Sequence, residues 1–372
     1  MQTSVRGARV VRRARAINHE RDGMKTQVLQ ALRACGIFGL ARALSAGRPR
    51  VLVYHNFSAC GEGESPVSVA CLRNQLEYLR RHFRVVKLSE LCRQLALGRP
   101  ARRLLALTVD DGRRNFYEFL FPLLKELQLP ATFFVVSSFI SRHDWLWTDK
   151  VLWLSRQPNS AEELGSDKLP SFFAMLNSMQ PEHRNACIEA LAQGMGSSIP
   201  KLAPSQYAPC SWDELREMCD SNLVEIGSHT VTHPILSTLR DDESALEIAT
   251  SRSQLEEQLG RSIEVFAIPN GTLKDYRPSQ VKQIREAGYV GAASAWDGLV
   301  EPGCDPYQLP RIGIANWTDH VRFTARVDGV EHYRHQLRRA VRAVHAGTVP
   351  RKAGTANGCY PQAKPLMTSS QE

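Results

Sequence analysis

Residues 104–112 read Leu-Leu-Ala-Leu-Thr-Val-Asp-Asp-Gly, an apolar and β-branched run that passes directly into two carboxylates and a glycine. A short apolar run that stops at turn residues is typical of a strand buried on both faces, as in parallel sheets. Segments of helical period separate it from similar runs at 51–55, 223–233 and 265–271, each of which also ends in polar residues. This alternation predicts an α/β, barrel-like fold, in which chemistry collects where the parallel strands end.

The same reading divides the chain into one large domain with short extensions. Residues 1–23 are rich in Arg and lack apolar periodicity, so we expect a disordered extension, followed by an amphipathic helix over 24–49. The large domain is expected over 50–329, and a basic helix with a disordered tail over 330–372. Residues 145–209 carry helical segments without strand signals, which indicates a helical insertion that shapes one rim of the cleft.

Composition excludes several classes of protein. The chain has 372 residues, 43% of them hydrophobic and 23% charged, and a formal net charge of +9 that comes largely from Arg clusters near both ends. No nucleic-acid motif accompanies these clusters, so we expect no nucleic-acid partner, although the basic helix near the C-terminus could touch an anionic membrane peripherally. Nine cysteines, an odd number without a CxxC pair, argue against a disulfide framework and against a cysteine zinc site.

One segment imitates a secretory signal. Lys25 and Arg33 precede a mainly apolar stretch over 34–46, but Arg42 interrupts it and its spacing is that of an amphipathic helix. Met24 is a possible alternative start. With the cysteine pattern, this predicts a cytoplasmic protein, with an exported or membrane-associated one as the alternative.

The strand ends carry the candidate chemistry. They bring together three imidazoles and two carboxylates, which suit a divalent metal and a proton-transfer pair: His55, Asp110, Asp111, His229 and His233. The two later histidines are four residues apart, so both can reach one metal, but no Glu lies between them and a general base must come from another strand. Adjacent aspartates can divide metal ligation and proton abstraction, although Asp-Asp-Gly is also a common turn.

These residues lie in blocks that resemble the polysaccharide deacetylase family of carbohydrate esterases, family four type. The blocks are TVDDG at 108–112, ATFF at 131–134, EIGSHTVTHP at 225–234, FAIPNG at 266–271 and LPRI at 309–312. The likeness covers roughly residues 50–315, and VYH at 53–55 is similar to the exopolysaccharide-associated subset.

The resemblance implies a distorted (β/α) barrel with fewer than eight regular repeats, and a metal-dependent hydrolase that removes acetyl groups from N-acetylated sugars. It makes Asp111, His229 and His233 the metal ligands and Asp110 the general base. Zinc is the expected metal, with cobalt, nickel or manganese as alternatives. The implied partner is an N-acetylated polysaccharide or oligosaccharide.

Two positions depart from the family pattern. The block at 268–271 reads Ile-Pro-Asn-Gly and lacks the Arg expected to orient the base, and Arg311 at a neighbouring strand end could replace it. No His occupies the usual place of the general acid after residue 309, although His320 lies a few residues beyond. The resemblance of 53–55 favours His55 as the acid, against the alternative that this His only caps or packs at the strand end.

Pro269, Asn270 and Gly271 are expected to shape a turn beside the substrate, and Trp296 to stack on a sugar ring, although aromatic residues more often pack in a core. We therefore expect an N-deacetylase acting on N-acetylhexosamine units of an exopolysaccharide, cell-envelope glycan or precursor. An O-acetyl carbohydrate esterase and a non-catalytic carbohydrate-binding relative are the alternatives. The intact Asp and His set argues against the second, because buried polar clusters are costly to keep without a metal.

Overall fold

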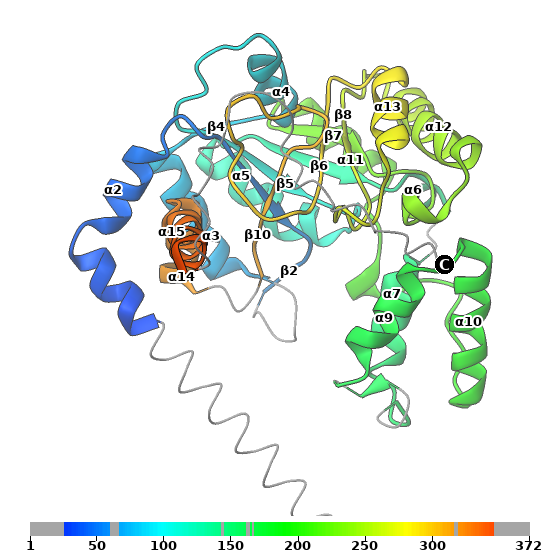
Figure 1. Ribbon diagram of the computed structural model, residues 1–372. Helices are drawn as coiled ribbons and strands as arrows, with labels where there is room; N and C mark the ends of the chain where they lie inside the picture. Colours follow the sequence, from blue (N-terminus) through cyan, green and yellow to red (C-terminus); the bar gives the residue numbers. More distant parts are fainter. Residues whose placement is uncertain are drawn as a thin grey trace, which may run out of the picture.

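The computed structural model describes residues 26–59, 67–142, 145–160, 164–165, 167–315 and 319–345, so the disordered extension expected over 1–23 and most of the C-terminal tail lie outside the described residues. Its centre is a parallel sheet with helices around it (Figure 1). The strands are β1 (Arg50–Tyr54), β4 (Arg84–Val86), β5 (Leu104–Val109), β6 (Ala131–Val135), β7 (Val224–Ser228), β8 (Val265–Ala267), β9 (Gly291–Ala293) and β10 (Ile312–Gly313). Strand β5 spans the residues predicted for it.

The sheet curls into the distorted barrel that the sequence predicts. Its strand order is β10-β1-β5-β6-β7-β8-β9. One edge of β5 has two partners in succession: β4 pairs with its first half, and β6 pairs with its second half. A parallel bridge from Ala293 to Leu309 then joins the β9 edge to the segment that leads into β10. Strand β10 itself is short, with only Ile312–Gly313 forming regular strand. A separate parallel pair, β2 (Phe57–Ser58) and β3 (Val67–Ser68), lies outside this sheet.

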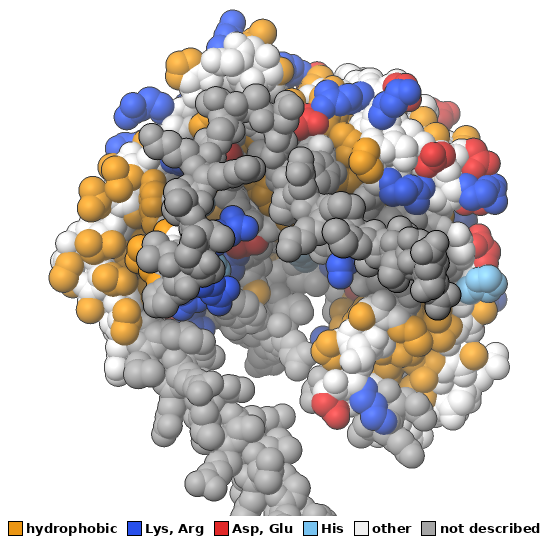
Figure 2. Space-filling view, viewed as in Figure 1, with side chains coloured by type: hydrophobic (Ala, Val, Ile, Leu, Met, Phe, Trp, Pro, Cys, Tyr) orange, Lys and Arg blue, Asp and Glu red, His pale blue; other side chains and the backbone are white. Residues whose placement is uncertain are grey.

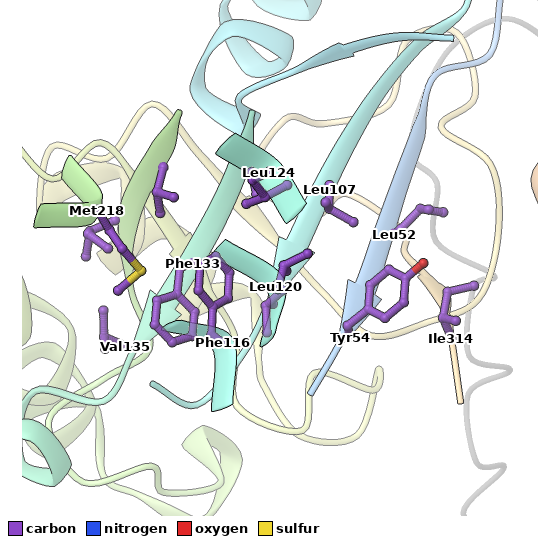
Figure 3. Packing of buried hydrophobic residues seen from close by; sticks show 14 of the residues in the cluster. Leu52, Tyr54, Leu107, Phe116, Leu120, Leu124, Phe133, Val135, Met218 and Ile314 are labelled. Carbon is purple, nitrogen blue, oxygen red and sulfur yellow. The ribbon is translucent and has the colours of Figure 1, made fainter. Parts of the chain in front are cut away.

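The alternation of side chains along β5 determines the face of the sheet on which the carboxylate after this strand lies. Leu105, Leu107 and Val109 belong to the main hydrophobic cluster, which packs the sheet against the outer helices, whereas Leu104 and Ala106 belong to a second cluster on the opposite face. Figure 3 shows the main cluster, where the rings of Phe116 and Phe133 stack with centroids 4.1 Å apart. Because strand side chains alternate with a period of two, Asp110 follows Leu104 and Ala106 onto the inner face, at the mouth of the barrel.

Helices surround the sheet. They are α3 (Val69–His82), α4 (Leu88–Ala96), α5 (Phe121–Leu127), α6 (Ser137–Arg142), α11 (Trp212–Asp220), α12 (Asp241–Leu259), α13 (Pro278–Glu286), α14 (His320–Val327) and α15 (Val330–His345). A π-helical segment, η1 (Phe116–Leu120), precedes α5, and a single 3-10 turn, η3 (Leu236–Thr238), precedes α12.

The segment over 145–209 contains helices and no regular strand in its described residues, as the sequence predicts. It contains α7 (Trp147–Leu154), α9 (Leu169–Asn177), α10 (Pro181–Gly194) and the turn η2 (Ser205–Tyr207). Figure 1 shows the three helices beside the sheet at the lower right. These helices bury a small cluster of their own, which includes Val151, Leu176 and Ile188 and takes in Ile235 from the loop after β7. The insertion is therefore packed onto the segment that follows one of the site strands.

The single helix expected over 24–49 is two helices. Residues 26–34 are helical, Gly36 then takes a positive φ of 77°, and α2 (Ile37–Leu44) follows. Glycine adopts this conformation without the Cβ clash that stops other residues, which accounts for the break. Helix α2 buries Phe38 and Ala41 in a cluster with Ala325 of α14. Among the described residues, no helix has the length and apolar character needed to cross a membrane.

Candidate active site

Two carboxylates follow β5 on a turn that depends on glycine. The backbone N–H of Asp110 donates to the Tyr54 carbonyl (3.1 Å), so Asp110 still belongs to the sheet. Asp111 and Gly112 both have positive φ, 85° and 94°. A Cβ on Gly112 would stand 2.6 Å from Cγ1 of Val135, closer than packing permits. The backbone therefore turns sharply after Asp110, and the two adjacent carboxylates point in different directions.

The loop after β7 holds the two histidines in a strained backbone. Thr230 and His233 have φ values of 71° and 57°, which residues other than glycine rarely adopt. The hydroxyl oxygen of Thr230 accepts the backbone N–H of His233 (3.0 Å), and Glu247 of α12 accepts the backbone N–H groups of residues 231 and 232. Such strain persists only where surrounding contacts fix it, and it is typical of functional sites.

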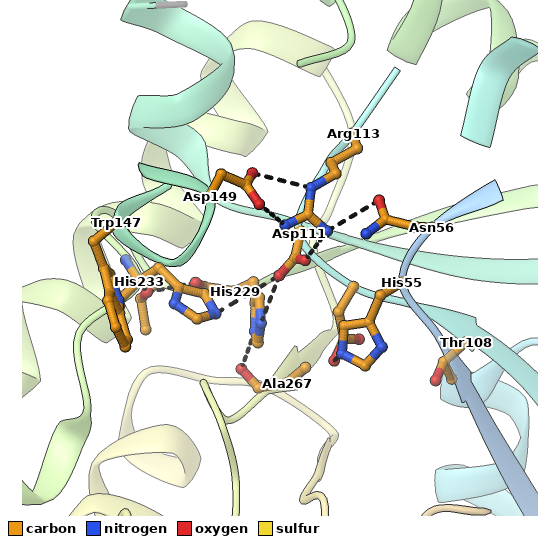
Figure 4. A network of polar contacts seen from close by, with 12 residues as sticks. His55, Asn56, Thr108, Asp111, Arg113, Trp147, Asp149, His229, His233 and Ala267 are labelled. Carbon is orange, nitrogen blue, oxygen red and sulfur yellow. Dashed lines mark hydrogen bonds and ion pairs between the residues drawn. The ribbon is translucent and has the colours of Figure 1, made fainter. Parts of the chain in front are cut away.

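Asp111, His229 and His233 form one buried group, with a ligand atom from each lying within 4.8 Å of the others. Oδ1 of Asp111 lies 3.8 Å from Nε2 of His229 and 3.7 Å from Nε2 of His233 (Figure 4). Nδ1 of His229 donates to the Ala267 carbonyl (2.7 Å), so the lone pair of the neutral ring is on Nε2. Two imidazoles and one carboxylate that converge in this way fit a divalent cation.

Burial and neighbouring charges set the ionisation states that such a cation needs. Burial lowers the pKa of His229, and it lowers the pKa of His233 to about 3, helped by the nearby His229. Burial would raise the pKa of Asp111, but Arg113 and the nearby histidines together outweigh it and hold that pKa well below its usual value. The group therefore presents neutral imidazoles and an ionised carboxylate, the forms that bind metals.

Asp110 lies beside this group with partners of its own. Nη1 of Arg311 donates to its Oδ1 (2.7 Å), and Nε of Arg311 donates to the Ser294 carbonyl (2.5 Å). Nε2 of His55 lies 3.9 Å from its Oδ2, on a side chain that is 53% exposed. Burial would raise the pKa of Asp110, but Arg311 and His229 lower it overall. The structure thus brings together an ionised carboxylate, an Arg that holds one of its oxygens, and an accessible His near the other.

Comparison with known proteins agrees with this geometry. The family model for polysaccharide deacetylases matches residues 98–292, more than half of the chain. The chain belongs to the polysaccharide deacetylase family. A poly-β-1,6-N-acetyl-D-glucosamine N-deacetylase of Staphylococcus aureus is 20% identical over 261 residues, which cover 67% of this chain and 68% of the relative.

Solved structures share the fold of this deacetylase. The deacetylase PplD of Streptococcus pyogenes, in complex with acetate, superposes with a TM-score of 0.53 at 18% identity, covering 75% of this chain and 98% of PplD. IcaB of Ammonifex degensii also gives a TM-score of 0.53, at 21% identity, covering 76% of this chain and 97% of IcaB. At these identities the likeness establishes the shared fold.

Two charged residues of the site were missed in the sequence. Nη1 of Arg113 donates to Oδ2 of Asp111 (2.6 Å) and to Oδ1 of Asn56 (3.2 Å), while its Nε and Nη2 donate to the carboxylate of Asp149 (3.1 and 2.6 Å). Arg113 stands two residues after Asp111, which could have marked it. Asp149 belongs to α7 of the insertion and gave no signal in the sequence.

The turn expected beside the substrate forms at residues 269–271, directly after β8. Asn270 has a φ of 57° and donates from Nδ2 to Asp275 (2.8 Å), so its side chain braces the turn. Gly271 also has a positive φ, and a Cβ there would stand 2.7 Å from the backbone nitrogen of Ala295. The turn therefore packs closely on the segment after β9, as a glycine at that position allows.

The surroundings of Trp296 and of His320 differ from those of the turn at residues 269–271. The carbonyl of Trp296 accepts the backbone N–H of Arg311 (3.0 Å), and its indole nitrogen is buried with no hydrogen-bond partner among the described residues. Its stacking on a sugar stays a prediction. His320 begins α14, where its ring packs edge-on against Tyr78 of α3. The structure thus places His55, and not His320, beside Asp110.

Proposed function

We propose that this polysaccharide deacetylase is a metal-dependent N-deacetylase that hydrolyses the acetamide of N-acetylhexosamine units in an exopolysaccharide, a cell-envelope glycan or a precursor. The observation that carries the proposal is the cluster at the barrel mouth, in which a possible ligand group, Asp111, His229 and His233, lies beside the Asp110–Arg311 pair. A carbohydrate-binding relative without turnover would not need a paired, ionised base next to a ligand group.

The metal group would be held by Asp111, His229 and His233, for which zinc is the expected cation and cobalt, nickel or manganese are alternatives. When bound, such a cation lowers the pKa of a water molecule and polarises the acetyl carbonyl. The orientation of His229 toward this position is fixed by its bond to the Ala267 carbonyl.

The protein's own residues then move the protons. Arg311 occupies Oδ1 of Asp110, so Oδ2 is left to take the proton of the attacking water as general base. His55 lies near that oxygen and is open to solvent, which suits it to donate a proton from Nε2 to the departing amine. Arg311 is itself held by the Ser294 carbonyl, so it keeps the carboxylate in one orientation.

The substrate class is inferred from the relatives. The Staphylococcus aureus relative is named for a β-1,6-linked polymer of N-acetylglucosamine. We propose the same class of substrate here, a polymer or oligomer of N-acetylated hexosamine. The turn at residues 269–271 and Trp296 follow β8 and β9 at the same end of the sheet as the ligand group, and this position supports the proposal that they contact such a chain.

Acetate release from β-1,6-linked N-acetylglucosamine oligomers tests the proposal. We expect activity that a chelator removes and that zinc or cobalt restores. Acetate released from acetylated xylan but not from the amide would instead indicate the O-acetyl esterase. A protein that binds zinc and oligomer without releasing acetate from either substrate would be the non-catalytic relative.

His55→Ala is expected to lower kcat by about a hundredfold while zinc affinity stays unchanged, since His55 lies near Asp110 but outside the ligand group. The basic limb of the pH–rate profile should also be lost, because the general acid supplies it. Steady-state acetate release across pH and zinc titration measure the two effects. His320→Ala serves as the control and should behave as the wild type; equal turnover in both variants would move the acid role to another residue.

We also propose that the protein acts in the cytoplasm, on a precursor or soluble oligomer, with peripheral contact to the membrane. The cysteines that the structure describes are not joined by disulfides, which suits a reducing compartment. Figure 2 shows hydrophobic side chains gathered over α2, where Leu40 and Leu44 are exposed. Helix α15 also exposes Leu337, next to the basic Arg338, and apolar and basic side chains of this kind support contact with an anionic membrane. Cell fractionation should give a cytoplasmic protein with a membrane-bound share that high salt releases; recovery from the medium or the periplasm would contradict this location.

A further inference from the structure

A chain of three buried charges runs from the metal-ligand group into the helical insertion. The side chains of Asp111, Arg113 and Asp149 are 8%, 5% and 0% exposed, and Arg113 lies between the two carboxylates in Figure 4. Burial alone would lower the pKa of Arg113, but Asp149 and Asp111 outweigh it and raise that pKa, so Arg113 is charged.

Stability alone is a poor explanation for this arrangement. Taking charges out of water costs as much as their mutual attraction returns, and apolar residues of the same volume are usually at least as stable. The arrangement is instead typical of residues that orient a metal ligand. The atoms of a ligand side chain that do not bind the metal are nearly always hydrogen-bonded to neighbouring polar groups of this kind. Arg113 itself is buried and has no access to a substrate.

We propose that Arg113 and Asp149 are a positioning pair that makes Asp111 a one-oxygen metal ligand, an inference that rests on the metal-dependent function proposed above. Nη1 of Arg113 occupies Oδ2 of Asp111 at 2.6 Å. The other oxygen, Oδ1, is the one that faces both histidines, at 3.8 and 3.7 Å. Arg113 thereby selects which oxygen of Asp111 remains available.

Asp149 fixes the plane of the guanidinium. It accepts Nε and Nη2 of Arg113 as a fork, at 3.1 and 2.6 Å, and holds the guanidinium in the orientation in which Nη1 is the nitrogen that contacts Asp111. Without Asp149, the guanidinium could turn and bind both oxygens of Asp111 through two of its N–H groups. The ligand oxygen would then be shared between Arg113 and the metal, and metal affinity would fall.

Both ends of the insertion clasp the segment that carries Arg113. At its start, α7 supplies Asp149. At its end, the backbone N–H of Arg114 donates to the Ala208 carbonyl (2.9 Å), and that of Cys210 donates to the Gly112 carbonyl (3.0 Å). The insertion therefore holds the turn after β5 from two sides.

The same helix also contacts the other half of the ligand group. Trp147, two residues before Asp149 on α7, donates from its indole nitrogen to the His233 carbonyl (3.1 Å). The guanidinium of Arg184, from α10, lies over the Trp147 ring at 4.4 Å from its centroid. Helix α7 thus links the Asp111 turn to the His233 loop, and the insertion sets the ligand geometry in addition to shaping a rim.

The test measures zinc affinity of the full-length, metal-free protein by calorimetry, together with the visible spectrum of the cobalt form. Asp149→Asn keeps the shape of the side chain but loses the charge that fixes Arg113. Arg113→Lys keeps the charge but loses the fork. We expect each to weaken zinc binding by about ten- to a hundredfold and to change the cobalt spectrum, and we expect the double variant to lose little more, because the two residues act as one unit.

Asp328→Asn is the matched control. Asp328 is also a buried carboxylate paired with an Arg, Arg42 at 3.1 Å, but the pair lies at the contact of α2 and α14. It should lower the melting temperature without changing zinc affinity. If Asp149→Asn fails to fold, Arg113→Lys carries the same test.

The outcomes separate the inference from the proposed function. A folded Asp149→Asn or Arg113→Lys protein with wild-type zinc affinity and cobalt spectrum would overturn the positioning role while leaving the metal-dependent function intact. A wild type that binds no divalent metal would contradict the proposed function, and the positioning role with it.

Discussion

His233→Ala is expected to remove zinc binding and acetate release together. His233 supplies one of three converging ligand atoms, so the variant keeps only His229 and Asp111. Apparent zinc binding energies of roughly 10–16 kcal/mol in four-ligand sites correspond to about 3 kcal/mol per ligand, which is on the order of a hundredfold in affinity. With zinc lost at working concentrations, acetate release should fall to background.

His233 is the better of the two histidines for this experiment. Its Nδ1 has no hydrogen-bond partner among the described residues, so alanine breaks no side-chain bond there. His229, in contrast, donates to the Ala267 carbonyl, and its removal would also leave that buried carbonyl unpaired. Histidine and alanine both carry a Cβ, so the cost of about 1–2 kcal/mol for the positive φ at position 233 is present in both proteins and should not separate their melting temperatures.

Zinc titration and acetate release measure the result on the same preparation. His320→Ala is the control, because His320 packs against Tyr78 and belongs to no ligand group. A folded His233→Ala protein that retains wild-type zinc affinity would show that the three residues do not form the metal site.

The strands could be predicted because each carries its own signal. The run at 104–109 is apolar over its whole length and stops at Asp-Asp-Gly, and β5 spans those residues. The break of the N-terminal helix at Gly36 was missed, because a single glycine within an amphipathic pattern is often tolerated. The π-helical turn over Phe116–Leu120 could not be predicted from the sequence either, since its apolar residues fit an ordinary α-helix equally well.

The site was predictable where its residues end strands. Asp110, Asp111, His229 and His233 each follow a buried run, and parallel strands bring such ends to one edge of the sheet. Arg311 was predicted as a substitute partner for the base, and it lies 2.7 Å from Asp110.

Asp149 could not be found in the same way. Its contact with Arg113 spans 36 positions and depends on how the insertion packs, for which the sequence carries no periodic signal. Asp149, the charge that orients Arg113 beside the ligand Asp111, is therefore the part of the site that only the structure could reveal.

Asp110→Asn is expected to produce the opposite pattern to a ligand variant, with turnover lost and zinc retained. Asparagine keeps the shape of aspartate, and its carbonyl oxygen can still accept from Arg311, so the local packing should hold. It cannot take a proton at the position of Oδ2, and removal of a general base typically costs about 10²–10⁴-fold in rate. We expect that loss in kcat, with KM nearly unchanged.

The adjacent Asp111→Asn variant sharpens this comparison, because it changes the same atoms one residue along the chain. Asp111 belongs to the ligand group and Asp110 does not, so zinc affinity should fall in Asp111→Asn and stay within about threefold of wild type in Asp110→Asn. Zinc calorimetry and single-turnover acetate release on both proteins separate binding from chemistry. A loss of zinc in Asp110→Asn, or turnover close to wild type with zinc bound, would contradict the division of labour between the two aspartates; the first result would place Asp110 among the ligands, and the second would require another base.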